Sequence, residues 1–441
     1  MNVAPTAPDD RARAHFVRSQ LPAQGLFHGH EWRIATGPFQ LDAGVAGQLE
    51  FLGRVLLQFN RAANRLYRLS AEGKQPGWIA ALLDQGKPAE LIALQRNEVF
   101  KNEVPRVIRP DLLLTEEGLR ITELDSIPGG IGLTAWLNQT YATHGPVLGG
   151  AAGMLRGFES IFGEARDVRI IVSDESAVYR PEMKWLAQQL GPRFSVAGPS
   201  PAALSEGTAV YRFFELFDVE NVPVAAELFR LSANRQLWMT PTPKPLFEEK
   251  LLLALLWNRN LREFWRQELG GAFFGKLLEW VPQTWVVDPT PLPPHAALPD
   301  LNLTDWRQLA SLSQRDRALV LKPSGFSAEA WGARGVSIGN DLSAEAWAAA
   351  VEKAIGRFES SPHVLQRFQR TKVFEAQYFD FESDQAVSMA GRVRLSPYYF
   401  VRGDGDQARA VLGGALATIC PSDKKVLHGM PEAILAPCAA G

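Results

Sequence analysis

Three carboxylates are expected to share one face of a short β-hairpin, where they could bind a hard metal cation. The segment RPDLLLTEEGLRITELDSIPGGIGLTAW (109–136) carries Asp111 on one run, then a Glu-Glu-Gly turn, then Glu123 and Asp125 on a second run. Residues two apart on a strand face the same side, so Glu123 and Asp125 point together and Asp111 lies within reach on the neighbouring strand. Oxygen ligands without His or Cys suit Mg²⁺, which usually binds together with substrate phosphates. A solvated hairpin with a charged outer face is the alternative that the pattern leaves open.

A second candidate is a lysine at the end of an apolar strand. Lys322 ends ALVLK and precedes a loop that contains Gly325, Gly332 and Gly335. Such a lysine can hold phosphate oxygens while the loop backbone closes over them. The pattern Gly-x-x-x-x-Gly-Lys-Ser/Thr is absent, so this is not a Walker A loop. A surface turn with a solvated lysine remains the alternative.

Two arginines alternate with apolar residues near the end of the chain. Arg392 and Arg394 would lie on one face of a strand, where they could hold a γ-phosphate or a substrate carboxylate bidentately. An exposed strand face explains the same alternation, and the sequence does not decide which arginine would face the phosphate.

The composition is that of an ordinary globular protein and excludes several classes. The 441 residues are too many for one core, the net charge is −2, and no basic excess points to nucleic acid. Two cysteines near the C-terminus form neither a disulfide framework nor a metal motif, which favours a reducing cytoplasm. No signal core and no apolar run of membrane-spanning length is present. The pair His28-Gly29-His30 lacks further ligands at metal-binding spacing.

The elements that must position these residues follow from periodicity. Residues 1 to about 12 are expected to be a loose tail, and residues 42–69 and 78–94 to be helical, before the hairpin. A glycine-rich turn after Pro128 enters another helix, and such a turn can bind an anion.

The middle of the chain predicts a small parallel α/β unit. VRIIVSDES, RPEMKWLAQQLG and FSVAG read as strand, helix and strand, and TAVYRFFELFDV as a further strand. Ligands sit beyond the carboxyl ends of such strands, where Ser173, Asp174, Glu175 and Tyr179 would lie. Asp174 could equally cap the following helix. No complete Gly-x-Gly-x-x-Gly follows the first strand, so a dinucleotide-binding domain is not supported.

The last part predicts an α+β region after the linker PTPKP (241–245). LFEEKLLLALLWN and AEAWAAAVEKAIGRF read as helices. HVLQRF, KVFEAQYFDF and SMAGRVRLSPYYFV read as antiparallel strands.

The hairpin motif resembles the metal-binding strand pair of circularly permuted ATP-grasp ligases, such as the glutathionylspermidine synthetases. In that family an Arg-x-Asp precedes a Glu-x-Asn and a proline turn; here Arg109-Pro110-Asp111 precedes Glu123-Leu124-Asp125 and Pro128. Asp125 stands where Asn is usual in the family. The aspartate still offers an oxygen ligand, and it adds a negative charge to the site. Carboxylates that come before the lysines match the permuted order, and the resemblance covers roughly residues 100–440.

The same resemblance implies roles for residues farther along the chain. Lys250 is similar to the family's first nucleotide lysine, Lys322 with Ser324 and Gly325 to the second lysine and phosphate loop, and Gln366 to the strand that leads to the adenine hinge. The implied catalytic residues are Arg109, Arg392 and Arg394. The implied nucleotide-binding residues are Lys250, Lys322, Ser324, Gly325 and Gln366. The implied metal ligands are Asp111, Glu123 and Asp125.

The resemblance implies a permuted ATP-grasp fold of mixed α+β and α/β class. Three segments are expected: N-terminal helices with the hairpin (1–145), a small pre-ATP-grasp-like α/β domain (146–240) and the nucleotide-binding region (241–441). The implied activity is an ATP- and Mg²⁺-dependent ligase that joins a small carboxylate to an amine through an acyl phosphate, in the cytoplasm, with neither nucleic acid nor membrane as partner. The alternative is a non-catalytic protein that keeps the fold and binds a nucleotide or metabolite.

Overall fold

The computed structural model describes residues 8–22, 26, 31–200, 204, 207–293, 296–330, 332 and 334–441. The pair His28 and His30 lies outside them. Contacts divide the chain into two compact units. Unit 1 comprises Met1–Gln58, Asn102–Thr242 and Thr371–Gly441, and unit 2 comprises Phe59–Lys101 and Pro243–Arg370. The segment 241–441 therefore contributes to both units.

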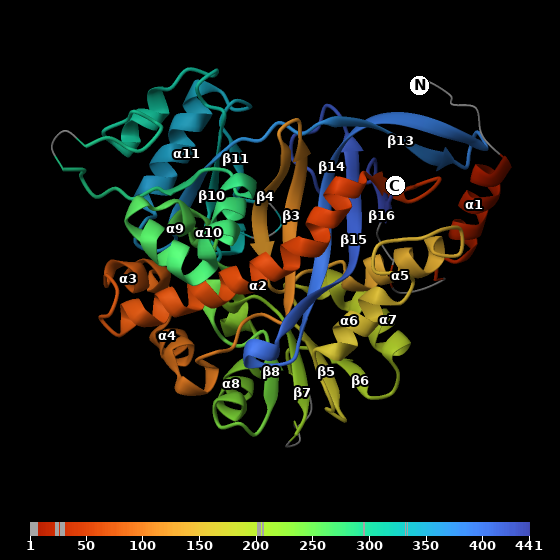
Figure 1. Cartoon of the computed structure of the whole chain (residues 1–441), viewed down its shortest axis with the longest axis horizontal. Helices are drawn as coiled ribbons and strands as arrows, with labels where there is room; N and C mark the ends of the chain where they lie inside the picture. Colours follow the sequence, from red (N-terminus) through yellow and green to blue (C-terminus); the bar gives the residue numbers. More distant parts are fainter. Residues whose placement is uncertain are drawn as a thin grey trace. The chain divides into compact units, whose positions relative to one another are not determined.

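The larger sheet of unit 1 joins the hairpin to strands from the far end of the chain. Its strand order is β1-β16-β15-β14-β3-β4, with β13 pairing with β14 and β2 with β16. The pairs that β16 makes with β1 and β2 are parallel, and the other pairs are antiparallel. The strands are β1 (Arg33–Ile34), β2 (Phe39–Leu41), β3 (Val107–Thr115), β4 (Gly118–Asp125), β13 (Val373–Asp380), β14 (Gln385–Arg402), β15 (Arg409–Pro421) and β16 (Ile434–Ala440). The predicted hairpin is confirmed as β3–β4, and β3 lies beside β14 (Figure 1).

Helices pack on this sheet where glycines allow close approach. α5 (Ile131–Tyr141) and α6 (Gly153–Ser160) contact β15. A Cβ on Gly153 would lie 2.3 Å from the carbonyl oxygen of Gly413 in β15, so the helix can approach this closely only with glycine there. α1 (Pro8–Ser19) also belongs to unit 1. The prediction of a loose tail is therefore wrong for residues 8–12, because Arg11 and His15 of this helix bind Asp384 at the β13–β14 turn.

The second sheet of unit 1 is the predicted parallel α/β unit. Its order is β6-β5-β7-β8, and all its pairs are parallel. The strands are β5 (Val168–Val172), β6 (Phe194–Ala197), β7 (Ala209–Phe213) and β8 (Trp238–Thr240). Between them lie η2 (Ala177–Tyr179), α7 (Arg180–Leu190), η3 (Leu216–Asn221) and α8 (Ala225–Ala233). Gly191 ends α7 with φ 92°, a left-handed conformation that favours glycine.

Unit 2 is built on a four-stranded antiparallel sheet with the order β11-β10-β12-β9. The strands are β9 (Thr284–Val286), β10 (Leu319–Pro323), β11 (Ser337–Ile338) and β12 (His363–Arg367). α11 (Ala344–Gly356) and η6 (Trp306–Ser311) cover it through a buried core that includes Trp285, Leu321, Trp347 and Leu365. The predicted strand–loop–strand around Lys322 and the helix after it are confirmed.

Helices from the N-terminal third of the chain complete unit 2. α2 (Ala43–Ala71) continues from unit 1 into unit 2. The helical region predicted at 78–94 is two helices, α3 (Trp78–Asp84) and α4 (Ala89–Arg96), because the turn Gln85–Pro88 interrupts it. The remaining elements of the unit are η1 (Glu98–Phe100), η4 (Pro245–Glu248), α9 (Leu251–Trp257), η5 (Arg259–Leu261), α10 (Arg262–Trp280) and η7 (Ala328–Ala330).

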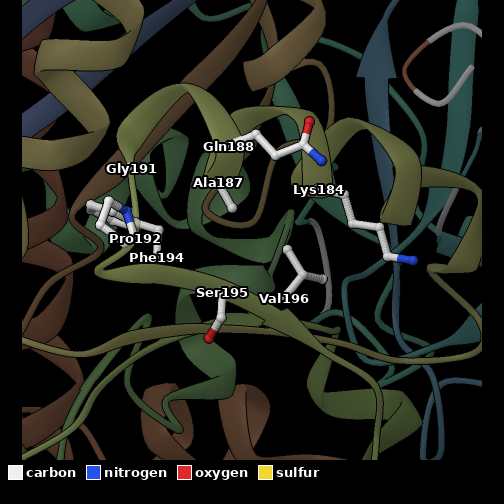
Figure 2. Close-up of a pocket in the computed structure, with 8 residues that line it drawn as sticks. All are labelled: Lys184, Ala187, Gln188, Gly191, Pro192, Phe194, Ser195 and Val196. Carbon is white, nitrogen blue, oxygen red and sulfur yellow. The ribbon is translucent and has the colours of Figure 1, made fainter.

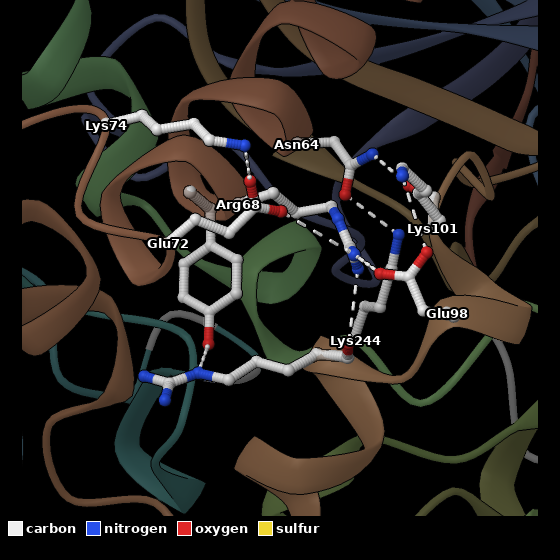
Figure 3. A network of polar contacts seen from close by, with 9 residues as sticks. Asn64, Arg68, Glu72, Lys74, Glu98, Lys101 and Lys244 are labelled. Carbon is white, nitrogen blue, oxygen red and sulfur yellow. Dashed lines mark hydrogen bonds and ion pairs between the residues drawn. The ribbon is translucent and has the colours of Figure 1, made fainter.

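A polar network connects the two segments of unit 2, residues 59–101 and residues 243–370. Lys244 is buried, and its Nζ donates to Oδ1 of Asn64 on α2 at 2.8 Å (Figure 3). Asn64 in turn donates to the carbonyl of Lys101 at 2.7 Å, and Arg68 pairs with Glu98. The helical residues 59–101 are thus part of the same unit as Lys250 and Lys322.

Candidate functional site

Strands β3, β4 and β14 bring two arginines and two aspartates together in unit 1. Arg109 lies opposite Asp125 in the strand register, and its Nη2 is 3.0 Å from Oδ2 of Asp125. Its Nε is 3.2 Å from Oδ1 of Asp111. Asp111 also lies 3.3 Å from Nη1 of Arg394 and accepts a hydrogen bond from Oγ of Ser396 at 3.1 Å. We call these five residues the arginine–aspartate cluster.

Burial and pairing set the ionisation of this cluster. Burial alone would lower the pKa of Arg109, but the charges of Asp111 and Asp125 outweigh it and raise that pKa well above its ordinary value. Burial raises the pKa of Asp125, and Arg109 offsets the rise only in part. The guanidinium therefore stays charged, and it neutralises the buried carboxylate of Asp111 and the half-buried carboxylate of Asp125.

The three carboxylates have the donor type and the common face that magnesium binding would need. Glu123 lies directly opposite Asp111, and residues opposite each other share a face. Among the residues that the structure describes, however, no group of three or more His, Cys, Asp or Glu side chains is arranged to hold a metal ion. Arg109 and Arg394 contact oxygens of the aspartates, so a cation bound there would have to replace these contacts.

The two arginines of β14 have different surroundings. Arg394 belongs to the arginine–aspartate cluster, whereas Arg392 donates from Nε to the carbonyl of Ser422 and from Nη1 to the carbonyl of Thr371, both at 2.7 Å. Arg392 thus ties the ends of neighbouring strands together. The register that the sequence left open brings Arg394 to Asp111.

The glycine-rich turn after Pro128 faces a carboxylate from the chain itself. Nη1 of Arg109 and the hydroxyl of Tyr398 both donate to the carbonyl of Gly129, at 3.1 and 2.8 Å. Glu182 of α7 accepts a hydrogen bond from the backbone N–H of Gly132, in the first turn of α5, at 2.9 Å. The N–H at the start of this helix, where such a turn can bind an anion, therefore donates in this structure to a buried carboxyl group that sequence reasoning did not select. Burial raises the pKa of Glu182 to about 7.

The structure shows contacts for some of the residues that the sequence placed beyond the carboxyl end of β5. Oδ1 of Asp174 accepts from Nη2 of Arg180 at 3.0 Å, and no side chain caps η2 or α7. The capping role that was the alternative for Asp174 is therefore wrong. The ring of Tyr179 lies where a Cβ on Gly129 would be, 2.2 Å from Cε1, so this turn requires glycine. A ligand-binding role for Ser173, Asp174, Glu175 and Tyr179 remains a prediction.

In unit 2 the strand lysine lies in a buried polar chain across the sheet. Nζ of Lys322 donates to Oε1 of Gln366 at 3.0 Å, and Nε2 of Gln366 donates to Oγ1 of Thr284 at 3.1 Å. The register of β10, β12 and β9 brings these three residues together. Two residues that the sequence assigned to the nucleotide thus meet within one sheet.

The other lysine lies against the loop that follows Lys322. Lys250 immediately precedes α9, and its Nζ donates to the carbonyl of Ala330 at 3.2 Å. Ala330 belongs to the loop Ser324–Gly335, of which Trp331 and Ala333 lie outside the described residues. We call this segment the glycine loop. Lys250 and the glycine loop, remote in the sequence, are therefore neighbours in unit 2.

Glu249, which the sequence did not single out, is at the centre of a buried network beside Lys250. Its Oε1 is 2.5 Å from Nζ of Lys87, and the side chains of both residues are almost fully buried, 1% and 0% exposed. Its Oε2 accepts from Oγ of Ser324 and, at 3.2 Å, from the N–H of Gly325. Ser324 and Gly325, predicted to bind nucleotide, therefore donate to Glu249 in this structure.

A cavity elsewhere in unit 1 involves none of the predicted residues. It measures about 470 Å³ and lies between α7 and β6, with Lys184, Gln188 and Ser195 among its lining residues (Figure 2). Figure 2 shows the side chain of Lys184 pointing away from Gly191 and Pro192 at the other end of the lining. The cavity therefore brings together no group of side chains that matches the predicted chemistry.

Comparison with solved structures identifies the fold. A glutathione synthetase-like effector from Globodera pallida, in its apo form, matches over 99% of this chain and 100% of its own, with a TM-score of 0.55 and 9% sequence identity. The chain has the ATP-grasp type of fold. A provisionally named γ-glutamylcysteine synthetase from Methylobacillus flagellatus KT matches over 86% of this chain and 88% of its own, with a TM-score of 0.41 and 11% identity. No family model and no curated protein sequence matches. The predicted likeness to ATP-grasp proteins is thus confirmed for the fold, and the permuted order and the pre-ATP-grasp-like domain remain predictions.

Proposed function

We propose that the chain is an ATP-dependent ligase that joins a small carboxylate to an amine. The observation that carries this proposal is the contact between Lys250 and the glycine loop that follows Lys322, in a fold shared with a glutathione synthetase-like effector. Two lysines around one loop suit the binding of a nucleoside triphosphate, because they supply positive charge for the phosphates and the loop supplies backbone N–H groups.

The nucleotide would be held by unit 2. Lys250 and Lys322 would contact phosphate oxygens, and Gln366 would orient Lys322 through the hydrogen bond that joins them. The glycine loop would cover the phosphates and exclude water, which protects a reactive acyl phosphate from hydrolysis. Arg109 and Arg394 would bind the acid and the transferred phosphoryl group, because guanidinium groups match both geometrically. The proposed role for Arg392 is indirect, since it binds backbone carbonyls.

The reaction would proceed in two displacements. The acid's carboxylate oxygen attacks the γ-phosphorus and the bond to the β-phosphate oxygen breaks, which gives an acyl phosphate and ADP. The amine then attacks the acyl carbon, and inorganic phosphate leaves as the amide forms. Asp111, Glu123 and Asp125 would hold Mg²⁺, which would offset phosphate charge when bound. The glutathionylspermidine synthetase-like subtype and a cytoplasmic location are part of this proposal. No described helix is both long and apolar enough to cross a membrane.

The proposal predicts ADP release by the wild-type chain when Mg-ATP is supplied with pooled small carboxylates and amines. Release should need both substrate classes, because the acyl phosphate forms on the acid and turns over on the amine. Replacing Lys322 with Met should cut the rate by about a hundredfold or more, since a charge on the transferring phosphates is lost. Coupled detection of ADP measures this, and Lys74→Met, at an exposed lysine of unit 2, is the matched control.

Two results would separate the proposal from its rival. Nucleotide binding without ADP release in any pool would favour a non-catalytic binding protein of this fold. ADP release that Lys322→Met leaves unchanged would mean that the phosphates bind elsewhere.

A second prediction concerns the carboxylates of β3 and β4. Glu123→Gln is nearly isosteric and should leave the free energy of unfolding close to wild type. It should weaken nucleotide binding about tenfold in the presence of Mg²⁺ and have little effect in EDTA, because one charge on the cation site is removed. Calorimetric titration with ATP under both conditions measures the difference. Equal affinities for wild type and variant in Mg²⁺ would remove Glu123 from the site.

A further inference from the structure

We infer that Glu249, held in place by Lys87, is a positioning residue that fixes the start of the glycine loop for the nucleotide phosphates. The consequence for nucleotide binding rests on the proposed function, whereas the consequence for the loop does not. The sequence offered no role for Lys87, which lies in a region without a recognisable motif.

Glu249 joins three segments of unit 2 through one carboxylate. Oε1 lies 2.5 Å from the ammonium of Lys87, in the turn between α3 and α4. Oε2 accepts from the hydroxyl of Ser324 and from the N–H of Gly325, where the chain leaves β10. With both oxygens engaged and the group buried, the carboxylate has one orientation, and the start of the loop is held in one direction.

The turn that carries Lys87 is itself fixed. Nε2 of Gln85 donates to the carbonyl of Phe358 at 2.5 Å, just after α11. Gly86 has φ 73°, and a Cβ there would lie 2.0 Å from the carbonyl oxygen of Ser360. The turn therefore packs against the backbone that follows α11, and only glycine fits at residue 86.

The burial of these groups points to positioning and not to direct contact with a ligand. The side chains of Lys87 and Glu249 are 0% and 1% exposed, and Ser324 is 2% exposed. A Cβ on Gly325 would lie 1.3 Å from the carbonyl oxygen of Glu248, so the loop starts in van der Waals contact with the backbone beside Glu249. Ser324 and Gly325 thus direct the loop, and the residues after them are left to meet the phosphates.

The next residue along the chain fixes a second point of the same loop. Lys250 follows Glu249 directly and donates to the carbonyl of Ala330. Glu329, the loop residue before Ala330, forms ion pairs with Lys353 of α11 at 2.7 Å and with Arg357, just after α11, at 2.8 Å. The peptide Glu249–Lys250 therefore couples the shape of the glycine loop to the lysine that the proposal places on the phosphates.

The ion pair of Lys87 and Glu249 also affects the electrostatic environment of the glycine loop. A buried carboxylate beside a loop that receives anionic phosphates would repel them unless a cation neutralises it. Lys87 supplies that cation without being exposed, so the net charge that the pair presents to the loop is zero.

The test uses the full chain with the double variant Lys87→Met/Glu249→Gln. Removing both charges avoids an unpaired buried ion, and the glutamine oxygen can still accept from Ser324 or Gly325, so folding should be preserved. The matched control is Lys74→Met/Glu72→Gln, which removes an exposed pair of unit 2 with a 2.7 Å separation. Thermal unfolding, hydrogen exchange of the glycine loop, and the dissociation constants of ATP and adenosine are measured for all three proteins.

We expect amide exchange in the glycine loop to rise about tenfold without nucleotide in the double variant, and ATP affinity to fall about tenfold. Adenosine affinity should change less than about twofold, since the loop contacts phosphates and not the base. The control should match wild type in every measurement. Unchanged exchange in the loop overturns the inference, and so does an equal loss of ATP and adenosine affinity, which would show a general structural role. Absence of ATP binding by wild type instead overturns the proposed function, while the exchange result still decides whether Glu249 fixes the loop.

Discussion

Replacing Asp111 with alanine is expected to lower the free energy of unfolding of unit 1 by about 3 kcal/mol. The carboxylate contacts Arg109, Arg394 and the hydroxyl of Ser396, and Asp111 is buried. Its removal breaks the ion pair of Arg394 and leaves Arg109 paired with Asp125 alone in this cluster. Breaking a buried pair typically costs about 3–5 kcal/mol, and the value belongs at the lower end because Arg109 keeps Asp125.

This loss is measured by unfolding the protein in urea and monitoring the hydrogen exchange of the backbone amides of residues 107–125. Glu117→Ala is the matched control on the same hairpin, because Glu117 pairs with Arg120 through a side chain that is 81% exposed. An exposed pair contributes less than about 1 kcal/mol. If both variants lost the same small amount, the arginine–aspartate cluster would be no more than a surface ion-pair network.

Asp111→Asn separates charge from shape in the same experiment. The amide keeps an acceptor for Ser396 but no longer neutralises Arg394. A loss intermediate between wild type and alanine is expected, since one hydrogen bond of about 1 kcal/mol is retained. The order of the three proteins therefore reports how much of the cluster's stability is electrostatic.

Local patterns were enough to predict the elements that carry these residues. The hairpin followed from alternating charges on either side of Glu116-Glu117-Gly118, and β3–β4 has that form. The strand that carries Lys322 was predicted in the same way, from an apolar run with clear ends. The helix predicted over LFEEKLLLALLWN is in the structure the 3-10 helix η4 followed by α9, which begins only at Leu251. Each of these signals lies within about a dozen residues, so no long-range information is needed.

Contacts between distant segments were not predictable in this way. The choice between Arg392 and Arg394 depends on how β14 pairs with β3, because both arginines lie on one face of β14 and only the position along the strand decides which of them meets Asp111. The buried pair of Lys87 and Glu249 reads, in the sequence, as two charged residues near helix starts, which usually face solvent. The break at Gln85–Pro88 could have been found, because Gly followed two residues later by Pro is a turn signal.

Glu182 could not be selected from the sequence either. It lies on an amphipathic helix, where it looks like an ordinary acidic residue of the first turn. Its burial against the N-terminus of α5 comes from the packing of α7 on α5. Arg109, Tyr179 and Tyr398 interact with it electrostatically. A carboxylate in that environment should make the stability of unit 1 depend on pH.

Stability conferred by Glu182 is expected to be fully present below about pH 4.5 and to be lost as the pH rises through about 7. The pKa is raised from 4.5 to about 7 in the folded chain, so between these values the folded state binds the proton more tightly than the unfolded state. A difference of this size corresponds to about 3 kcal/mol, which the wild type should lose relative to Glu182→Gln between pH 4.5 and 8. The glutamine cannot titrate, yet its oxygen can still accept from the N–H of Gly132.

Unfolding free energies of wild type and Glu182→Gln, measured in urea from pH 4.5 to 8, test this expectation as a difference curve. The subtraction cancels the titration of Asp125 and of other groups to first approximation, because both proteins contain them. Glu227→Gln is the control: Glu227 is an exposed carboxylate of unit 1 whose pKa is lowered by Arg230, so its effect falls below this pH range. A flat difference curve for Glu182→Gln would mean that the carboxylate is ionised throughout, and that the N–H groups at the start of α5 with Arg109 stabilise its charge as well as water does.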